Sequence, residues 1–181
     1  GGDTVYLPPS RNWALTAPVL LLAIVPLFAN WGAASRRGQT DTSDFAVDLL
    51  NSVEPYGVLV TVGDNDTFPL WYAQEVLGVR QDVLIANTSL MNTDWYARQM
   101  IRRPTRDYDP AKGPAAFRGQ TWTKPQGAAL NLTLDQVDAL PQYQEVQQDQ
   151  LFEAGKIRAV IPKQLLQKAD IMVLRLIMEG R

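Results

Sequence analysis

Polar residues follow each of two apolar runs in the middle of the chain, and they are the residues best suited to chemistry. Asp64, Asn65 and Asp66 come directly after the first run, and Asn87 follows the second. Carboxylate and amide oxygens can bind a divalent cation or accept hydrogen bonds from sugar hydroxyls. The same residue types also favour turns, and Asp66 or Thr67 would cap a helix and complement its dipole. Both the binding role and the capping role stay open.

Two aromatic pairs accompany these polar residues, Trp71 with Tyr72 and Trp95 with Tyr96. Because aromatic rings bury large apolar areas, core packing accounts for at least one member of each pair. The indole of Trp71 or Trp95 could alternatively stack on a carbohydrate. The residues of this ligand-binding hypothesis are Asp64, Asn65, Asp66, Asn87, Trp71 and Trp95.

The composition restricts the chemistry severely, because the 181 residues include no histidine and no cysteine. Thiolate nucleophiles, disulfides and the commonest zinc and haem ligands are therefore excluded. We predict no catalytic residue, no metal site and no cofactor. Seventeen basic residues balance 19 acidic ones without a basic block, so nucleic acid is not an expected partner.

The two apolar runs and the segment between them determine the expected fold. Residues 57–62 are apolar and β-branched, as in a parallel strand buried on both faces, and residues 82–86 form a second run. Residues 68–77 have helical spacing, and Gly78 can end that helix. Two strands joined by such a helix form a right-handed βαβ unit, in which ligands bind beyond the carboxyl ends of the strands. The polar residues described above follow those ends.

Other segments carry weaker signals. A helix is expected over 44–53, capped by Thr42 or Ser43, and another around Trp95, capped by Asn92 or Thr93. Further expected features are a long Pro-rich surface loop at 102–126, a capping box at Thr133–Gln136 that opens a short helix, an exposed polar stretch at 142–150, a strand at 156–161 and a final helix at 164–179.

An uncharged segment lies near the start of the chain, after a polar lead-in at 1–11. Its length matches a bilayer, so we expect a transmembrane helix over 12–35. Interfacial tryptophans belong at the ends of such a helix, and prolines are tolerated where neighbouring helices cover the freed carbonyls. A cleaved signal peptide and a buried soluble helix are the alternatives. The residues assigned to the membrane anchor are Trp13, Pro18, Pro26 and Trp31.

Together these patterns predict an α/β protein in which one N-terminal transmembrane helix precedes a small three-layer domain at 38–181. A short parallel sheet with a βαβ core would form the centre of that domain. One arginine before the helix and two after it would by themselves favour a cytoplasmic domain.

The run GDNDTFPLWYAQEVLGVRQDVLIANTSLMNTDWYARQM resembles a family of bacterial polytopic membrane proteins of unassigned function. That family is related to protein O-mannosyltransferases of the GT-C class. The resemblance implies that residues 13–31 correspond to the last membrane span. It also implies that the soluble domain lies on the periplasmic side of the bacterial inner membrane. In GT-C enzymes the catalytic carboxylate lies in a loop between early membrane helices, so the resemblance assigns no glycosyltransferase activity to this chain.

We therefore expect a non-catalytic, single-span accessory subunit that stabilises a larger bacterial membrane complex. Its partners would be other integral-membrane subunits and lipid, and a photosynthetic reaction centre–light-harvesting assembly is one such complex. The alternative is the soluble tail of a GT-C-like protein glycosyltransferase, which would recognise an acceptor or glycan at the acidic segment. A carbohydrate-binding module without an enzyme is a third possibility.

Overall fold

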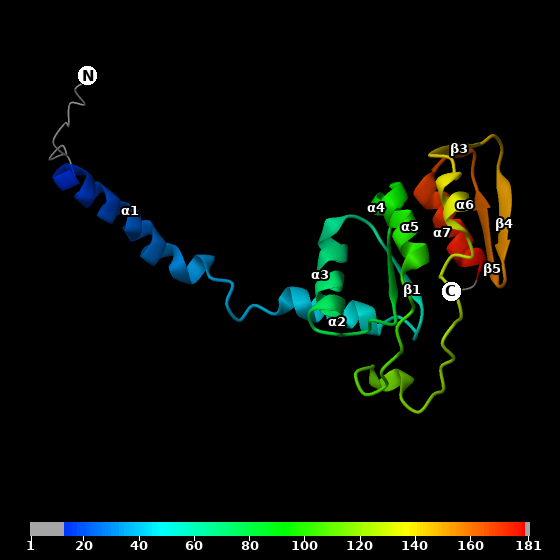
Figure 1. Cartoon of the computed structure of the whole chain (residues 1–181), viewed down its shortest axis with the longest axis horizontal. Helices are drawn as coiled ribbons and strands as arrows, with labels where there is room; N and C mark the ends of the chain where they lie inside the picture. Colours follow the sequence, from blue (N-terminus) through cyan, green and yellow to red (C-terminus); the bar gives the residue numbers. More distant parts are fainter. Residues whose placement is uncertain (1–12, 180–181) are drawn as a thin grey trace, which may run out of the picture. The chain divides into compact units, whose positions relative to one another are not determined.

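A computed structural model describes residues 13–179, with side chains described from residue 16 onward. The chain divides into two compact units, an N-terminal unit up to Gln39 and a C-terminal unit from residue 40 (Figure 1). Each unit is described by itself below. The side chain of Trp13 lies outside the described residues.

The N-terminal unit contains one helix, α1 (Trp13–Ala34), with Pro18 and Pro26 inside it. Its bounds agree with the helix expected over 12–35. Residues 16–34 are long and apolar enough to cross a membrane, with a mean hydropathy of 1.8. A signal sequence near the N-terminus would satisfy the same criterion. Trp31 is exposed near the end of the helix.

The C-terminal unit begins with α2 (Asp41–Asn51), followed by β1 (Val58–Thr61), α3 (Asp64–Glu75) and β2 (Leu84–Asn87). β1 and β2 pair in parallel, with Val58 opposite Leu84 and Thr61 opposite Asn87. The expected βαβ unit is therefore present. Gly78, at φ 67°, follows α3 as expected, because this backbone conformation suits glycine.

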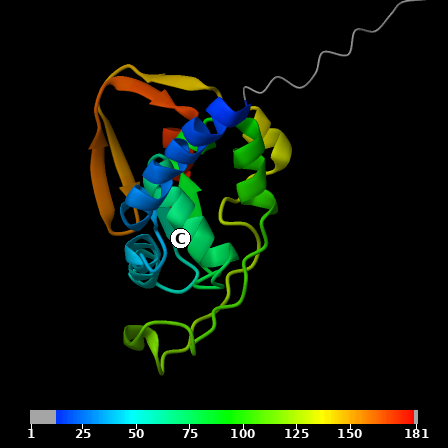
Figure 2. The same cartoon turned by 90° about the vertical axis from the view of Figure 1, so that its left-hand side faces the viewer.

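Side chains on the two faces of β2 enter two different apolar clusters. Ile85 packs with residues of α2 and α3, whereas Ala86 belongs to a cluster built from α5 (Asp94–Arg102), α6 (Leu134–Asp138) and α7 (Lys168–Met178). This alternation is the period of two that a strand imposes on its side chains. Helices thus cover both faces of the short sheet, as expected for a three-layer α/β domain (Figure 2).

Two expectations about the first strand and helix are wrong. The first run is not fully buried, because Val60 in β1 and Val62 after it are 43% and 70% exposed. The acidic segment is not a loop, since α3 already starts at Asp64. Its N-cap position is occupied by Gly63 at φ 81°, not by Asp66 or Thr67.

Other boundaries also differ. α2 starts at Asp41 with Thr40 in the N-cap position, earlier than expected. A short helix, α4 (Thr88–Met91), precedes α5, and Thr93 occupies the N-cap position of α5 as expected. The Pro-rich segment is irregular apart from the short 3₁₀ helix η1 (Ala115–Phe117), and the capping box of Thr133 and Gln136 is confirmed at the start of α6.

The C-terminal part contains more strands than expected. β3 (Tyr143–Val146) pairs antiparallel with β6 (Gln164–Gln167), and β4 (Gln150–Ala154) pairs antiparallel with β5 (Ile157–Ile161). β5 confirms the strand expected at 156–161. The helix expected from residue 164 is wrong in its first turn, because that turn is β6 and α7 follows it. The four strands form one long interrupted hairpin, here called the ribbon (residues 143–167).

An ion pair joins α5 to α6 and gives a pH-dependent prediction. Arg98 donates to both carboxylate oxygens of Asp138 at 2.7 and 2.6 Å. These hydrogen bonds lower the pKa of the Asp138 carboxyl. The contribution of the pair to stability is therefore present above the ordinary aspartate pKa and is lost as pH falls through the lowered one. Because both side chains are partly exposed, this contribution is small.

Arg98→Ala is expected to raise the pKa of Asp138 toward the ordinary aspartate value, because the donated hydrogen bonds are lost. A carboxyl ¹³C NMR titration of the wild-type and variant chains measures this change directly. An unchanged Asp138 titration in the variant would contradict the ion pair.

Candidate functional site

A pocket of about 350 Å³ opens between α3, β2 and α5 in the C-terminal unit. α3 contributes Trp71 and Glu75, one helical turn apart, and Leu84 and Ile85 of β2 also line the pocket. α5 and its C-cap contribute the remaining polar and aromatic lining, which includes Trp95, Tyr96, Gln99 and Arg103. Pockets of this size, apolar but with a few polar groups, are typical of small-molecule sites.

Tyr96 fixes the aromatic side of the pocket. Its ring centroid lies 6.4 Å from that of Trp71 and 5.5 Å from that of Trp95, the latter in an edge-on arrangement. The Tyr96 hydroxyl donates to the Ile85 carbonyl at 2.9 Å and accepts the Asn87 backbone N–H at 3.2 Å. Burial raises the pKa of Tyr96, so this hydroxyl stays protonated at neutral pH. Its two hydrogen bonds to β2 hold the ring in place near both indoles.

Charged and amide side chains line the pocket beside these aromatic rings. The Arg103 guanidinium donates to Glu75 at 2.9 Å and to the Gln74 side-chain oxygen at 3.3 Å. Gln74 is fully buried, and its amide donates to the carbonyls of Arg80 and Val83 at 2.8 Å each. Arg103 is therefore oriented from the interior of the unit, while Glu75 reaches the surface with a side chain that is 53% exposed.

The hollow continues beyond these residues. A second hollow of about 360 Å³ shares Glu75, Trp95, Gln99 and Arg103 with the first and adds Arg102. Trp95 is 56% exposed, so its indole face is accessible from solvent. The arrangement offers flat apolar surfaces beside hydrogen-bonding groups.

The predicted polar residues do not gather at this pocket. Asp64 and Asn65 are exposed and Asp66 is half-buried in the first turn of α3, where negative charge complements the helix dipole. At 1.5 Å per residue, Asp64 lies about 16 Å from Glu75 along the axis of α3. Among the described residues, no group of three or more acidic side chains is placed to hold a metal ion.

Asn87 is buried, and its side chain makes hydrogen bonds within the fold. It is 1% exposed, and its amide donates to the Gly63 carbonyl at 2.8 Å and to the Thr67 hydroxyl at 2.7 Å. Its side-chain oxygen accepts the Leu90 N–H at 2.9 Å, which makes Asn87 the N-cap of α4. Asn87 therefore connects the ends of both parallel strands. Of the predicted ligand-binding residues, the pocket brings together Trp71 and Trp95.

Sequence reasoning did not assign Glu75, Gln99 or Arg103 to a site. A signal for them exists in the spacing, because Glu75 stands four residues after Trp71 and Gln99 stands four residues after Trp95. Residues four apart share one face of a helix. Two helices that flank one strand and each carry an aromatic–polar pair could have predicted this pocket.

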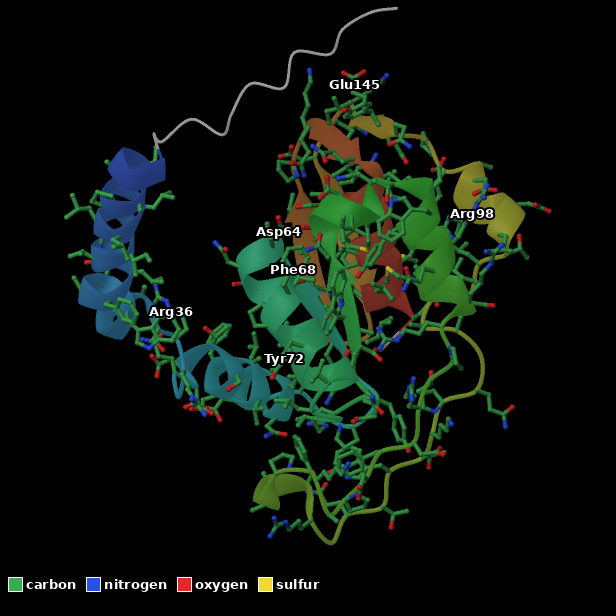
Figure 3. The ribbon with its side chains drawn as sticks, turned by 60° about the vertical axis from the view of Figure 1, so that its left-hand side comes forward. Arg36, Asp64, Phe68, Tyr72, Arg98 and Glu145 are labelled. Carbon is green, nitrogen blue, oxygen red and sulfur yellow. The ribbon has the colours of Figure 1, made fainter. Side chains whose placement is uncertain are left out.

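A second surface, here called the α3 outer face, consists of Phe68, Tyr72 and Val76. These residues follow each other at intervals of four, and they are 54%, 49% and 66% exposed. Figure 3 shows Asp64, Phe68 and Tyr72 along one side of α3. The other side of the same helix is buried through Leu70 and Ala73. A helix that is apolar on both sides is typical of a helix buried in a larger structure.

The comparison with known protein families concerns the part of the chain that holds both surfaces. Residues 42–128 match TMEM260-associated domain 2. The match covers 87 of the 181 residues and includes nearly all of α2, the βαβ unit, α4, α5 and the whole Pro-rich segment. The pocket and the α3 outer face thus lie inside the matched residues, whereas the ribbon and α7 lie outside them. No curated protein and no solved structure is significantly similar to the chain.

Proposed function

We propose that this chain is a non-catalytic accessory subunit of a larger membrane protein complex, in which α1 anchors it and the C-terminal unit contacts neighbouring subunits. The observation that carries the proposal is the α3 outer face, which presents three large apolar side chains to solvent. Phe45 of the adjoining α2 adds a further exposed ring. Burying such a surface against a partner releases its contact with water and stabilises the complex.

The partner we propose for this face is an integral-membrane subunit with an apolar surface near the bilayer. Six residues, 35–40, connect α1 to α2. A chain of that length spans at most about 20 Å, so the C-terminal unit would stay near the surface of a bilayer crossed by α1. The prolines of α1 support a neighbouring helix as well, because packed helices can cover the carbonyls that a proline leaves free.

We also propose the membrane, the side of the membrane and the assembly in which the chain resides, following the expectations from sequence. The chain would reside in a bacterial inner membrane with its C-terminal unit on the periplasmic side, and a photosynthetic reaction centre–light-harvesting complex is the assembly we propose to test first. The resemblance to a family related to O-mannosyltransferases, with which the TMEM260 match is loosely consistent, supports the periplasmic placement. It adds no catalytic group to the described residues.

Tyr72→Arg is expected to reduce the amount of co-purifying complex at least about tenfold, because docking would bury an unpaired guanidinium. The tagged full chain is expressed in its native membranes, solubilised in a mild detergent and separated by native electrophoresis. Mass spectrometry then identifies integral-membrane proteins present in fixed ratio to the chain. Pigment absorbance in the same band would identify a photosynthetic assembly.

Gln144→Arg is the matched control, since it adds the same charge to an exposed position on β3. It should leave the complex intact. A photo-cross-linker at position 72 should connect the chain to one identified membrane subunit. Migration of the wild-type chain alone, or equal recovery of complex with Tyr72→Arg and Gln144→Arg, would contradict the proposal.

A further inference from the structure

The Pro-rich segment at residues 102–126 differs in charge from the rest of its unit. It holds six basic and two acidic residues, whereas the remainder of the C-terminal unit holds eight basic and 16 acidic ones. The segment lies at one end of the unit, away from α6 and the ribbon (Figures 1 and 2). We propose that this end of the unit docks on the anionic phospholipid headgroups of the bilayer that α1 crosses, an inference that rests on the proposed membrane anchor.

Most cations of the Pro-rich segment are accessible to a ligand. Arg103 is the partly buried one, and it pairs with Glu75. Lys124 pairs with Asp107 at 2.8 Å, but the Asp107 side chain is 85% exposed. Since exposed ion pairs contribute little free energy, Lys124 can exchange Asp107 for another anion. The cations that are exposed and take part in no ion pair among the described residues are Arg102, Arg106, Lys112 and Arg118.

The two ends of the segment come together around a hollow of about 710 Å³. Arg102, Arg103 and Lys124 line this hollow together with Thr105, and none of its described lining residues is acidic. Lysine and arginine bind phosphate groups through charge-assisted hydrogen bonds, which are stronger than neutral ones. The hollow therefore offers a lipid phosphate two exposed cations, Arg102 and Lys124, at the base of the segment.

Two aromatic rings hold the outer turn of the segment. The ring centroids of Phe117 and Trp122 lie 5.6 Å apart in an edge-on arrangement, and Gly119 between them has a φ of 76°. Arg118 is exposed within this turn. Tryptophan is enriched at the headgroup level of membranes, where its ring is partly buried and partly hydrated. The turn thus combines a cation with an aromatic ring suited to the same environment.

The connection to α1 keeps the segment within reach of the membrane. Residues 35–40 span at most about 20 Å, and they include the exposed Arg36 and Arg37. The helix α2 that follows has 11 residues and is about 16 Å long. Near its C-terminal end the Leu50 carbonyl accepts a hydrogen bond from Arg80, which also makes the cation–π contacts to the segment. The segment therefore lies about one short helix away from the connection.

The acidic remainder of the unit gives the docking a direction. At physiological ionic strength the Debye length is about 8 Å, so an anionic bilayer acts mainly on the charges that touch it. An orientation that places the acidic remainder on the headgroups is repelled, whereas one that places the Pro-rich segment there is attracted. Each basic residue at an anionic surface should increase the docked population about fivefold.

The test uses the full chain, which has no cysteine and can be labelled at one introduced thiol. Gln120→Cys, at an exposed position of the outer turn, carries a fluorophore. The chain is inserted into nanodiscs that contain a lipid with a spin-labelled headgroup as quencher. Quenching should be strong in nanodiscs of equal parts phosphatidylglycerol and phosphatidylcholine and weak in phosphatidylcholine alone. It should be lost in 1 M NaCl, where the Debye length is about 3 Å.

Removing three cations should abolish the docking. Arg106→Gln, Arg118→Gln and Lys124→Gln, combined in one chain, should lower the ratio of docked to undocked chains on the order of 100-fold. The quenched and unquenched fractions of the fluorescence decay measure this ratio. Far-UV circular dichroism verifies that the fold is retained.

Two matched controls use the ribbon. A fluorophore at Gln144→Cys, an exposed position of β3, should be unquenched in both kinds of nanodisc. A second triple variant removes the same charge from exposed positions of the ribbon and should dock as the wild type does. Equal docking by the wild type and the first triple variant would overturn the proposal. The substitutions of the second triple variant are Lys156→Gln, Arg158→Gln and Lys163→Gln.

Failure of this inference can be told apart from failure of the proposed function. A chain that does not enter nanodiscs would overturn the membrane anchor, and lipid docking with it. A chain that enters them without quenching by phosphatidylglycerol at position 120 would overturn lipid docking alone. If a protein subunit of the native complex then covered position 120, the segment would belong to a protein interface.

Discussion

Asp82→Ala is expected to destabilise the C-terminal unit by about 3–5 kcal/mol, because it leaves a buried guanidinium without its counter-ion. Arg80 is 3% exposed, and it donates to both carboxylate oxygens of Asp82 at 3.0 Å. Its third contact is the carbonyl of Leu50 at 3.0 Å. Asp82 also accepts the Tyr56 backbone N–H at 3.1 Å. The variant therefore breaks a network that joins α2 to the turn before β2.

Urea unfolding of the full chain in detergent, followed by far-UV circular dichroism, measures this loss. Glu153→Ala is the control, because it removes one partner of an exposed ion pair with Arg158 in the ribbon. That control should change the free energy of unfolding by less than about 1 kcal/mol. A loss below about 1 kcal/mol in Asp82→Ala would show that the Arg80 guanidinium finds water or another partner.

The Pro-rich segment should respond to the same substitution. The Arg80 guanidinium carbon lies 5.2 Å from the ring centroid of Tyr108 and 5.7 Å from that of Phe117. These cation–π contacts hold part of the segment against its own unit. When Arg80 moves in Asp82→Ala, hydrogen exchange should accelerate around residues 108–117 more than in α5.

Asn87→Ala is expected to cost about 3 kcal/mol, because three hydrogen bonds of a buried amide are lost at about 1 kcal/mol each. The bonds join Asn87 to Gly63, Thr67 and Leu90. Losing them removes the N-cap of α4 and the connection between the ends of β1 and β2. The same urea experiment measures the cost.

Asn65→Ala is the matched control, since it makes the same chemical change at an exposed position in the first turn of α3. It should stay within about 0.5 kcal/mol of the wild type. If Asn87→Ala also left the free energy of unfolding unchanged, the assignment of Asn87 to a structural hydrogen-bond network would be wrong.

Much of the fold could be predicted because its signals are local. The apolar run at β2, Gly78 after α3 and the capping box at Thr133 each depend on a few adjacent residues. The boundary of α3 could not be predicted in the same way. Aspartates such as Asp64 and Asp66 are common in turns, and the helical spacing of apolar residues begins only at residue 68. The structure instead starts α3 at Asp64, because the positive φ of the N-cap residue Gly63 redirects the chain shortly after β1.

The candidate site was harder to predict from the sequence, because it depends on contacts between residues that are far apart along the chain. From the sequence Asn87 is a polar residue that follows a strand, but its amide donates hydrogen bonds to Gly63 and Thr67, which are 24 and 20 residues earlier. The sequence indicates Trp71 and Trp95 as aromatic candidates, whereas it gives no sign that Arg103 belongs with them. Its contacts with Gln74 and Glu75 require α3 and α5 to be side by side, which no local pattern specifies.

The ribbon described at the C-terminal end has a consequence for handling the protein. β3 and β4 pair with β6 and β5, and the sheets they form have two strands each, so both long edges carry backbone groups without a neighbouring strand among the described residues. Leu151 and Val160 face each other across the ribbon and are 67% and 61% exposed. Open edges beside apolar side chains are templates for strand addition by another polypeptide. Overproduction of the chain by itself should therefore favour self-association through the ribbon, and Lys substituted for Leu151 should suppress it.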